Sequence, residues 1–461
     1  MRKHFLALGL LLCGFWGAGC HHRGGDQSAD QKDSLRAEYA PLADSVKEEL
    51  RFAWNNYVRY AWGHDALRPL SRTPYDWYAH SLLMTPVDAF DTMWLMGLTA
   101  EADSAKQLVL DSLRVDYHMS VSQFEVTIRL LGGLLSAYEL DGDKGFLRLA
   151  TDLGNRLIKA FRSPTGMPYR FVNLATGAVS GKRSNPAEIG TMLLEYGTLT
   201  QLTGDSSYYK TAKKAVVTLF KHRSPRTGLV GSGINVETGQ WEQTESSISG
   251  GIDSYYEYLL KAWKLFGDED CKRMWDSSLV AVNRYLSDTV GGTLWYGHRQ
   301  MDTGTVLQPL YGALDAFFAG ALAMSGDTIR ARSLQASNDK MWRLAGLEPE
   351  LLNYRTMHIE NGYYALRPEN LESCYYLYHY TKDTLYLNMG RNFFESLVRY
   401  CRTAHGYAAI KDVRNMLPDD LMESFFLAET LKYAYLLFAS EKTLDFNQVI
   451  FNTEAHPLRI R

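Results

Sequence analysis

Ile-Arg-Leu-Leu-Gly-Gly-Leu-Leu-Ser-Ala-Tyr-Glu-Leu-Asp-Gly-Asp, residues 128–143, contains the pattern that best predicts the fold of this chain. Apolar residues recur at helical spacing over 128–140, and Gly142-Asp143 then ends the helix, because Gly readily adopts the left-handed conformation found just after a helix. The Gly-Asp pair recurs after later helical segments, at Gly204-Asp205, Gly267-Asp268 and Gly326-Asp327. Successive pairs are roughly 60 residues apart, which is enough for two helices and their loops. We therefore predict an all-α toroid built from helical hairpins.

Other segments with the same spacing of apolar residues are also predicted to be helical. They lie at 189–202, 209–220, 255–266, 310–324, 371–380, 387–400 and 425–438. Loops rich in Gly, Asp and Thr separate them, and two extended pieces at 228–231 and 292–296 are predicted to form small β-hairpins in these loops. No Pro/Ser-rich linker divides the chain beyond residue 35, so we predict one large domain at 36–461.

The N-terminus has the features of a bacterial lipoprotein signal peptide. Basic residues precede an apolar run at 5–15, and Gly17-Ala18-Gly19 then leads into Cys20, which resembles a lipobox. The run is too short for a transmembrane helix. We predict a signal peptide at 1–20, lipidation of Cys20, and a flexible polar tether at 21–35. A plain secretory signal is the alternative, because Gly17 departs from the aliphatic residue usual in a lipobox.

The cysteine count and the charge narrow the class of partner. Beyond the leader the chain has only Cys271, Cys374 and Cys401, without C-x-x-C spacing, which excludes a disulfide framework and disfavours a cysteine-based zinc site. At most one disulfide is possible. The net charge is −3 over 461 residues, and the Lys and Arg residues are dispersed. This pattern predicts no nucleic-acid binding and no polybasic membrane surface, and it favours a neutral ligand.

Carboxylates recur in short segments that are rich in aromatic residues or Gly. These segments lie at 124–125, 251–256, 367–369, 422–426 and 453–457. Acids transfer protons and recognise hydroxyls, and aromatic faces stack on pyranose rings, so the set predicts a sugar-cleaving pocket. For any one segment taken alone, the alternative is an acid that caps a helix or pairs with a surface Lys.

Helix starts explain where several of these acids lie. Ser122 and Glu125 fit a capping box. Pro368 places Glu369 in the first turn of a helix, where the macrodipole favours an ionised carboxylate suited to act as a base. Asp253 follows two glycines and is expected at the N-terminus of the next helix. If alternate helices of a toroid begin at one rim, these acids converge there.

Taken together, the segments resemble glycoside hydrolase family 47, the inverting α-1,2-mannosidases. The resemblance is greatest to the branch that includes the endoplasmic-reticulum degradation-enhancing mannosidase-like proteins. The matching blocks keep the order of the family and cover nearly all of the chain after residue 50. They are 53–54, 60–65, 85–92, 124–135, 187–190, 253–261, 366–373, 422–432 and 451–457.

The resemblance implies an (α/α)7 barrel with a calcium ion at the bottom of the pocket. It implies that Thr453 binds Ca²⁺ through its hydroxyl and its backbone carbonyl, while waters and mannose hydroxyls fill the other positions. Ca²⁺ is a hard cation that takes six to eight oxygen ligands, in agreement with this arrangement. Without the resemblance, residues 453–456 would be interpreted as an ordinary C-terminal tail.

The resemblance also implies roles for the acids. Glu369 is the expected base, Glu125 is the expected acid, and Asp253 is the rival acid. Inversion requires two carboxyl groups far enough apart for a water to fit between base and sugar. Further residues are expected to bind the sugar or calcium-bound waters: Arg129, Glu188, Arg367, Glu372, Glu423, Phe425, Glu429 and Glu454.

One departure from the family bears on specificity. Residues 313–320 lack the His that the trimming enzymes of the family have there, so the preferred branch of the glycan is open.

The expected activity is hydrolysis of terminal α-1,2-linked mannose from mannose-containing oligosaccharides, by a monomer in the bacterial cell envelope or secreted from it. Two alternatives are a non-catalytic mannose-binding protein on the same fold, and an (α/α)-barrel hydrolase or lyase with another substrate.

Overall fold

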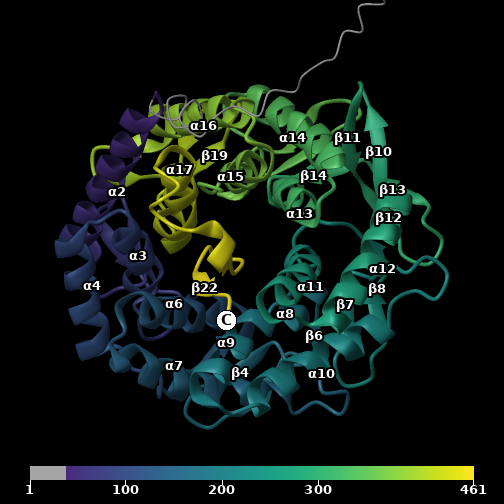
Figure 1. Ribbon diagram of the computed structural model, residues 1–461, viewed down its shortest axis with the longest axis horizontal. Helices are drawn as coiled ribbons and strands as arrows, with labels where there is room; N and C mark the ends of the chain where they lie inside the picture. Colours follow the sequence, from purple (N-terminus) through teal and green to yellow (C-terminus); the bar gives the residue numbers. More distant parts are fainter. Residues whose placement is uncertain (1–37) are drawn as a thin grey trace, which may run out of the picture. The chain divides into compact units, whose positions relative to one another are not determined.

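The computed structural model describes residues 38–461. Within them, an inner ring of helices surrounds the centre of the fold (Figure 1). The inner helices are α3 (Met84–Leu95), α6 (Gly132–Asp141), α9 (Leu193–Thr203), α11 (Asp253–Phe266), α13 (Phe317–Ser325), α15 (Glu369–Thr381) and α17 (Leu431–Phe438). Each contacts the next around the ring, and the turn before α17 contacts α3 and closes it. Most residues of the inner helices are buried, and in α13 every residue from Phe317 to Met324 is buried.

An outer layer of helices completes the hairpins. Its members are α2 (Ala40–Ala61), α4 (Thr99–Ser112), α7 (Lys144–Leu157), α10 (Ser207–Lys221), α12 (Glu269–Tyr285), α14 (Thr328–Arg343) and α16 (Leu385–Cys401). Helix α2 packs on α17, and each of the others packs on the inner helix that precedes it. The outer helices bury one face, as in α12, where Cys271, Met274 and Trp275 point inward one turn apart. This arrangement is the predicted (α/α)7 barrel.

Short helices and small antiparallel sheets connect the hairpins. The short helices are α5 (Gln123–Glu125) and α8 (Pro186–Gly190), the 3₁₀ turns Ile158–Phe161, Leu314–Ala316 and Phe446–Gln448, and the π-helical turns Val126–Leu131 and Phe426–Thr430. The two-stranded sheets are β1 (Ala66–Arg68) with β2 (Thr73–Tyr75), β10 (Ser287–Val290) with β11 (Thr293–Tyr296), β17 (Arg402–Thr403) with β18 (Gly406–Tyr407), β19 (Ile410–Asp412) with β20 (Leu417–Pro418), and β21 (Val449–Phe451) with β22 (Pro457–Arg459). The three-stranded sheets are, in spatial order, β3 (Ser120–Ser122), β4 (Phe171–Asn173) and β5 (Val179–Ser180); β6 (Arg183–Ser184), β7 (Gly233–Asn235) and β8 (Trp241–Gln243); β13 (Val306–Gln308), β12 (His298–Gln300) and β9 (Glu245–Ser246); and β14 (Leu310–Gly312), β15 (Leu351–Asn353) and β16 (His358–Asn361).

The predicted Gly-Asp helix stops are confirmed. Gly142, Gly204, Gly267 and Gly326 each follow an inner helix with φ of 83°, 80°, 67° and 96°, which is the left-handed C-cap geometry. The Asp that follows then caps the next helix in three of the four cases, because its side chain accepts the orphan N–H of Gly145, Cys271 or Arg330. The pair therefore ends an inner helix and begins an outer one.

Several predicted elements differ from the structure. The segment 310–324 was predicted as one helix, but residues Leu310–Gly312 form β14, paired with β15, and only Phe317–Ser325 is α-helical. A short apolar run does not distinguish a buried strand from a helix. The segment 189–202 is interrupted between α8 and α9, and 228–231 contains no strand, whereas the predicted hairpin at 292–296 is formed by β10 and β11.

The C-terminal hairpin of β21 and β22 lies inside the ring (Figure 1), where β22 contacts α6 and β21 contacts α11. Its turn packs on Gly132 and Gly133, at the start of α6. A Cβ at Gly132 would lie 2.5 Å from Nδ2 of Asn452, and one at Gly133 would lie 2.7 Å from Cγ1 of Val87 and 3.2 Å from the His456 ring. The Gly-Gly pair therefore provides the space in which the turn is seated.

Gly132→Ala is expected to destabilise the protein by about 1–3 kcal/mol, because the added methyl group displaces the Asn452 amide from its hydrogen bonds. The free energy of unfolding in urea measures this effect. Gly320→Ala is the matched control, since it also lies in an inner helix but its Cβ would meet its nearest neighbours at 3.4 Å, an ordinary contact. Equal stability of the two variants would contradict the proposed role of Gly132.

The remaining predictions concern the cysteines and the N-terminus. Cys271, Cys374 and Cys401 are all buried and unpaired. Within residues 38–461, no helix combines the length and the apolar composition that a membrane span requires. The predicted signal peptide, Cys20 and the tether at 21–35 lie outside the described residues.

Candidate active site

A cavity of about 310 Å³ opens within the ring of inner helices, and eight acids contribute to its lining. Three predicted catalytic residues, Glu125, Asp253 and Glu369, lie in its wall together with Thr453. Other predicted residues in the lining are Arg129, Glu188, Arg367, Glu372, Phe425, Glu429 and Glu454. Residues as far apart in the sequence as Glu125 and Glu454 thus meet at one place.

Local helix geometry places the three catalytic candidates. Glu125 follows the predicted cap, since its N–H donates to Oγ of Ser122 at 3.2 Å. Asp253 and Glu369 are the first residues of α11 and α15, with Pro368 at the N-cap of α15. The side chain of Asp253 accepts a hydrogen bond from the N–H of Ser254 at 2.7 Å. Both helix starts thus project an acid into the cavity.

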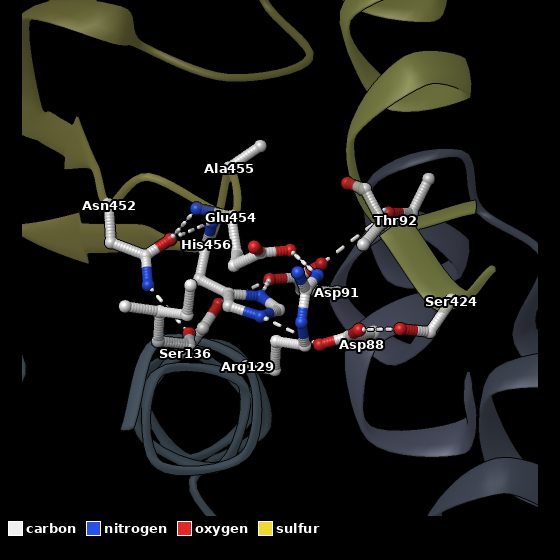
Figure 2. Close-up of polar contacts among 12 residues, drawn as sticks. Asp88, Asp91, Thr92, Arg129, Ser136, Ser424, Asn452, Glu454, Ala455 and His456 are labelled. Carbon is white, nitrogen blue, oxygen red and sulfur yellow. Dashed lines mark hydrogen bonds and ion pairs between the residues drawn. The ribbon is translucent and has the colours of Figure 1, made fainter. Parts of the chain in front are cut away.

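Arg129 is held by acids and aromatic rings. Its guanidinium lies 3.0 Å from Oε2 of Glu125 and also pairs with Glu454 (Figure 2). It is placed between the rings of Trp77 and Phe425, at 5.1 and 5.6 Å from their centroids. Burial lowers the pKa of Arg129, but the neighbouring carboxylates outweigh it and raise the pKa, so the group remains a cation. Arg129 and Glu125 thus form an i,i+4 ion pair in the cavity wall.

Two π-helical turns contribute residues to the cavity lining. The turn Val126–Leu131 carries Arg129, and the turn Phe426–Thr430 carries Glu429. A π-turn inserts one extra residue and so rotates the side chains that follow it, and such turns are common at functional sites. Apolar spacing predicted ordinary helices over both segments.

Burial changes the protonation of the acids in the cavity. It raises the pKa of Asp253 to about 7, with a further contribution from Glu257, and it raises the pKa of Glu369 to about 7 against the opposing effect of Arg367. Burial also raises the pKa of Glu372 to about 8, although Lys261 opposes it. The cavity therefore contains carboxyl groups that titrate near neutral pH.

The turn between β21 and β22 contributes to the lining of the cavity through Thr453 and Glu454. His456, at the end of the same turn, does not line the cavity and belongs to a buried ionic cluster (Figure 2). In that cluster Nδ1 of His456 lies 2.7 Å from Asp91, and Nε2 lies 3.3 Å from Asp88. Asp88 and Asp91 thus anchor the turn and do not line the cavity.

Comparisons with known proteins agree with this geometry. The family model of glycosyl hydrolase family 47 matches residues 49–460. The chain belongs to glycosyl hydrolase family 47. It is 36% identical over 451 residues to human mannosyl-oligosaccharide 1,2-alpha-mannosidase IB, with 90% of this chain and 69% of that protein covered. It is 35% identical over 466 residues to mouse ER degradation-enhancing alpha-mannosidase-like protein 2, with 92% and 79% covered.

Solved structures give the same result for the fold. The alpha-1,2-mannosidase from Trichoderma reesei superimposes with a TM-score of 0.84 at 29% identity, over 91% of this chain and 99% of that one. Cellobiose 2-epimerase from Bacillus thermoamylovorans has a TM-score of 0.57 at 11% identity, which shows a shared fold alone. The family, the (α/α)7 barrel and the prediction of a glycoside hydrolase are therefore confirmed.

One predicted site residue of this family 47 chain, Glu423, does not line the cavity. Burial raises the pKa of Glu423, while the charge of Arg129 and a hydrogen bond from Trp77 oppose this increase. Glu188 lines the cavity, and its Oε1 atom pairs with Nε of Arg170 at 2.8 Å. Arg367 lines it as well, and its guanidinium forms a fork-like pair with Glu350.

Some residues of the site were missed in the sequence. Glu257 lines the cavity one helical turn after Asp253, and its side chain pairs with Lys261, a further turn along α11. The i,i+4 spacing of these three charged residues was a usable signal. Trp77 gave no such signal, because it lies in a loop and meets Arg129 only through the tertiary fold.

Thr453 fits the single protein ligand that the family resemblance implies for calcium. The hydrogen bonds within residues 38–461 leave its hydroxyl and carbonyl oxygens without a donor, while its N–H donates to Tyr258. Glu429 and Glu454 share a hydrogen bond nearby, and burial together with Glu454 raises the pKa of Glu429. No cluster of three His, Cys, Asp or Glu side chains in the described residues could hold a metal, so any site here depends on oxygens of other kinds. The hydroxyl and carbonyl oxygens of Thr453, with the acids Glu429 and Glu454 close by, are the kind of oxygen ligands that suit Ca²⁺.

Proposed function

We propose that the protein is a calcium-dependent inverting exo-α-1,2-mannosidase that removes terminal α-1,2-linked mannose from mannose-containing oligosaccharides. The observation that carries this proposal is the convergence of Asp253, Glu369 and Thr453 on one cavity. The names of the relatives support the substrate class, since they describe mannosyl-oligosaccharide 1,2-α-mannosidases.

Glu369 is the proposed general base. It lies at the N-terminus of α15, and its Oε2 atom is buried without a hydrogen-bond partner in the described part of the chain. That oxygen is free to accept a proton from the water that attacks the sugar. The helix N-terminus favours the ionised form that a base requires, in opposition to burial.

Asp253 is the proposed general acid. Its carboxyl is buried and has a pKa raised to about 7, so that a large share of molecules hold its proton at neutral pH. Glu125 is the other candidate, but its carboxylate already accepts from Arg129 and orients that cation. We therefore assign the donated proton to Asp253 and the positioning of Arg129 to Glu125.

Calcium at Thr453 would supply positive charge that orders the hydroxyls of the terminal sugar and favours ionised carboxylates around it. Glu429, Glu454 and Glu188 surround that position as acceptors for sugar hydroxyls and waters. Phe425 offers an aromatic face in the cavity wall, which suits stacking on the apolar face of a mannose ring.

Release of mannose from α-1,2-mannobiose, followed by NMR, tests the proposed function. Calcium is expected to support release of β-mannose, EDTA to abolish it, and added calcium to restore it. Thr453→Ala is expected to lose calcium-stimulated activity. Release of α-mannose would refute inversion, and full activity in EDTA would refute calcium dependence. Calcium-dependent mannose binding without hydrolysis would favour the mannose-binding alternative.

The pH dependence of kcat/KM is expected to be bell-shaped with its maximum near pH 7. Glu369 must be ionised, so activity is lost as the pH falls below its pKa, whereas Asp253 must be protonated, so activity is lost as the pH rises through about 7. Asp253→Asn is expected to remove the alkaline limb from the residual activity, and Glu125→Gln to retain it. If the alkaline limb disappeared only in Glu125→Gln, Glu125 and not Asp253 would be the general acid.

α-Mannosyl fluoride, whose leaving group needs little protonation, is expected to be hydrolysed well by Asp253→Asn.

We further propose that the enzyme is a monomer attached to a bacterial cell envelope through a lipid on Cys20. The support is the leader sequence alone, with small residues before Cys20 and a polar tether after it. Cys20→Ser is expected to move the protein from the membrane fraction to the soluble fraction. An unchanged distribution would contradict lipidation and favour a secreted form.

A further inference from the structure

A buried acid, Glu195, lies outside the cavity and has no role in the proposed chemistry. It belongs to the inner helix α9, its side chain is fully buried, and it does not line the cavity. No Lys, Arg or His in the described residues forms an ion pair with it, and its Oε2 atom has no hydrogen-bond partner there. A buried carboxyl group without a cation is costly, so its retention calls for a structural reason.

The single oxygen Oε1 of Glu195 accepts two hydrogen bonds. The hydroxyl of Tyr258 donates to it at 2.7 Å, and Nδ2 of Asn452 donates to it at 2.8 Å. Tyr258 comes from α11, and Asn452 opens the C-terminal turn. Glu195 therefore joins two elements that are distant in the sequence, next to the turn that carries Thr453.

The bond to Tyr258 determines how Thr453 is held. Because the Tyr258 proton points to Glu195, the lone pairs of its oxygen remain available to accept the N–H of Thr453 at 3.2 Å. A phenol without this acceptor could turn its proton elsewhere. The chain of bonds thus runs from the Thr453 N–H through Tyr258 to Glu195.

The bond to Asn452 determines the shape of the turn. Nδ2 of Asn452 donates to Glu195 and to the carbonyl of Ile128, which orients its Oδ1 atom toward the turn. That Oδ1 atom accepts the N–H groups of Glu454 and His456, both at 2.9 Å. The turn needs such support because Ala455 has φ of +58°, a left-handed conformation that a residue with a Cβ adopts at a cost of about 1 kcal/mol or more.

We infer that Glu195 is a positioning residue for the calcium site, acting through Tyr258 and Asn452 to aim the hydroxyl and carbonyl oxygens of Thr453 at the ion. The inference rests on the proposed calcium site at Thr453. Residues behind metal ligands orient the ligands, and their loss typically weakens metal binding by about 10–100-fold. Glu195 needs only to accept hydrogen bonds, so a neutral side chain with an oxygen at the same position is expected to replace it.

Calcium affinity of the full-length protein, measured by isothermal titration calorimetry, tests this role. Glu195→Leu, which removes the acceptor, is expected to raise the Kd for Ca²⁺ by about 10–100-fold. Glu195→Gln, which keeps an acceptor oxygen, is expected to bind calcium nearly as well as the unsubstituted protein. Leu194→Ala is the matched control, because it alters the buried face of the same helix and lowers stability without touching the network.

Tyr258→Phe provides a second variant that removes a single oxygen and is expected to fold. It is expected to weaken calcium binding by about tenfold. Unchanged calcium affinity in folded Glu195→Leu or in Tyr258→Phe would overturn the inference. If the unsubstituted protein bound no calcium, the proposed calcium site and this inference would both fail, whereas calcium binding that is insensitive to these substitutions would remove the inference alone.

Discussion

Glu369→Gln is expected to lower kcat for α-1,2-mannobiose by about 10²–10⁴-fold while KM changes little. The amide has nearly the size of the carboxyl group and fits the same buried site, but it cannot accept a proton from the attacking water. The Oε2 atom of Glu369 has no hydrogen-bond partner within residues 38–461, so no other contact is lost with it. Steady-state rates of mannose release at saturating calcium measure the effect.

The control for this variant is Glu360→Gln, which changes a solvent-exposed acid in β16 outside the cavity. It is expected to leave kcat and KM unchanged. If Glu369→Gln retained more than about a tenth of the activity, Glu369 would not be the general base. A parallel loss of mannose binding would instead indicate that the substitution disturbs the site as a whole.

Asp91→Asn is expected to cause the largest loss of stability, about 3–5 kcal/mol. Asp91 is buried in α3, where its carboxylate pairs with Nζ of Lys432 at 2.7 Å and with the His456 ring at 2.7 Å. Burial raises the pKa of Asp91, but Lys432 and His456 outweigh it and lower that pKa, so the acid is ionised. An amide in its place would leave buried cations without a counter-charge.

The free energy of unfolding in urea measures this loss. Asp116→Asn is the control, because Asp116 pairs with Arg114 at the exposed surface and its removal is expected to leave the unfolding midpoint unchanged. A similar midpoint for Asp91→Asn and the unsubstituted protein would show that the cluster contributes no net stability. His456 belongs to the same turn as Thr453 and Glu454. Asp91→Asn is therefore also expected to lose part of its affinity for calcium.

The same cluster predicts how stability depends on pH. Burial lowers the pKa of His456, but Asp91 and Asp88 outweigh it and raise the pKa to about 9. A group with a raised pKa in the folded state adds stability below its unfolded pKa of about 6.5, and this stability is lost as the pH rises through the folded value. The unsubstituted protein is therefore expected to become less stable between about pH 6.5 and 9.

Local sequence signals were sufficient for the ends of several helices and for the positions of two of the catalytic candidates. Each Gly-Asp pair ends a helix because only the residues next to it decide whether the chain turns into the left-handed region. The starts of α11 and α15 at Asp253 and Glu369 follow from neighbouring Gly and Pro in the same way. Such interactions act within one helical turn, so spacing along the chain reveals them.

The sequence by itself therefore determined the hairpin repeat, the helix ends and, through the family resemblance, the residues that surround the cavity. Only the tertiary structure decided how Arg129 is enclosed by Trp77 and Phe425, and how Asp91 meets His456, 365 residues away. It also decided that Tyr258 links Glu195 to Thr453 through hydrogen bonds. These contacts join side chains from different helices of a closed ring, and their geometry is set by packing across the ring and not by the spacing of residues along it.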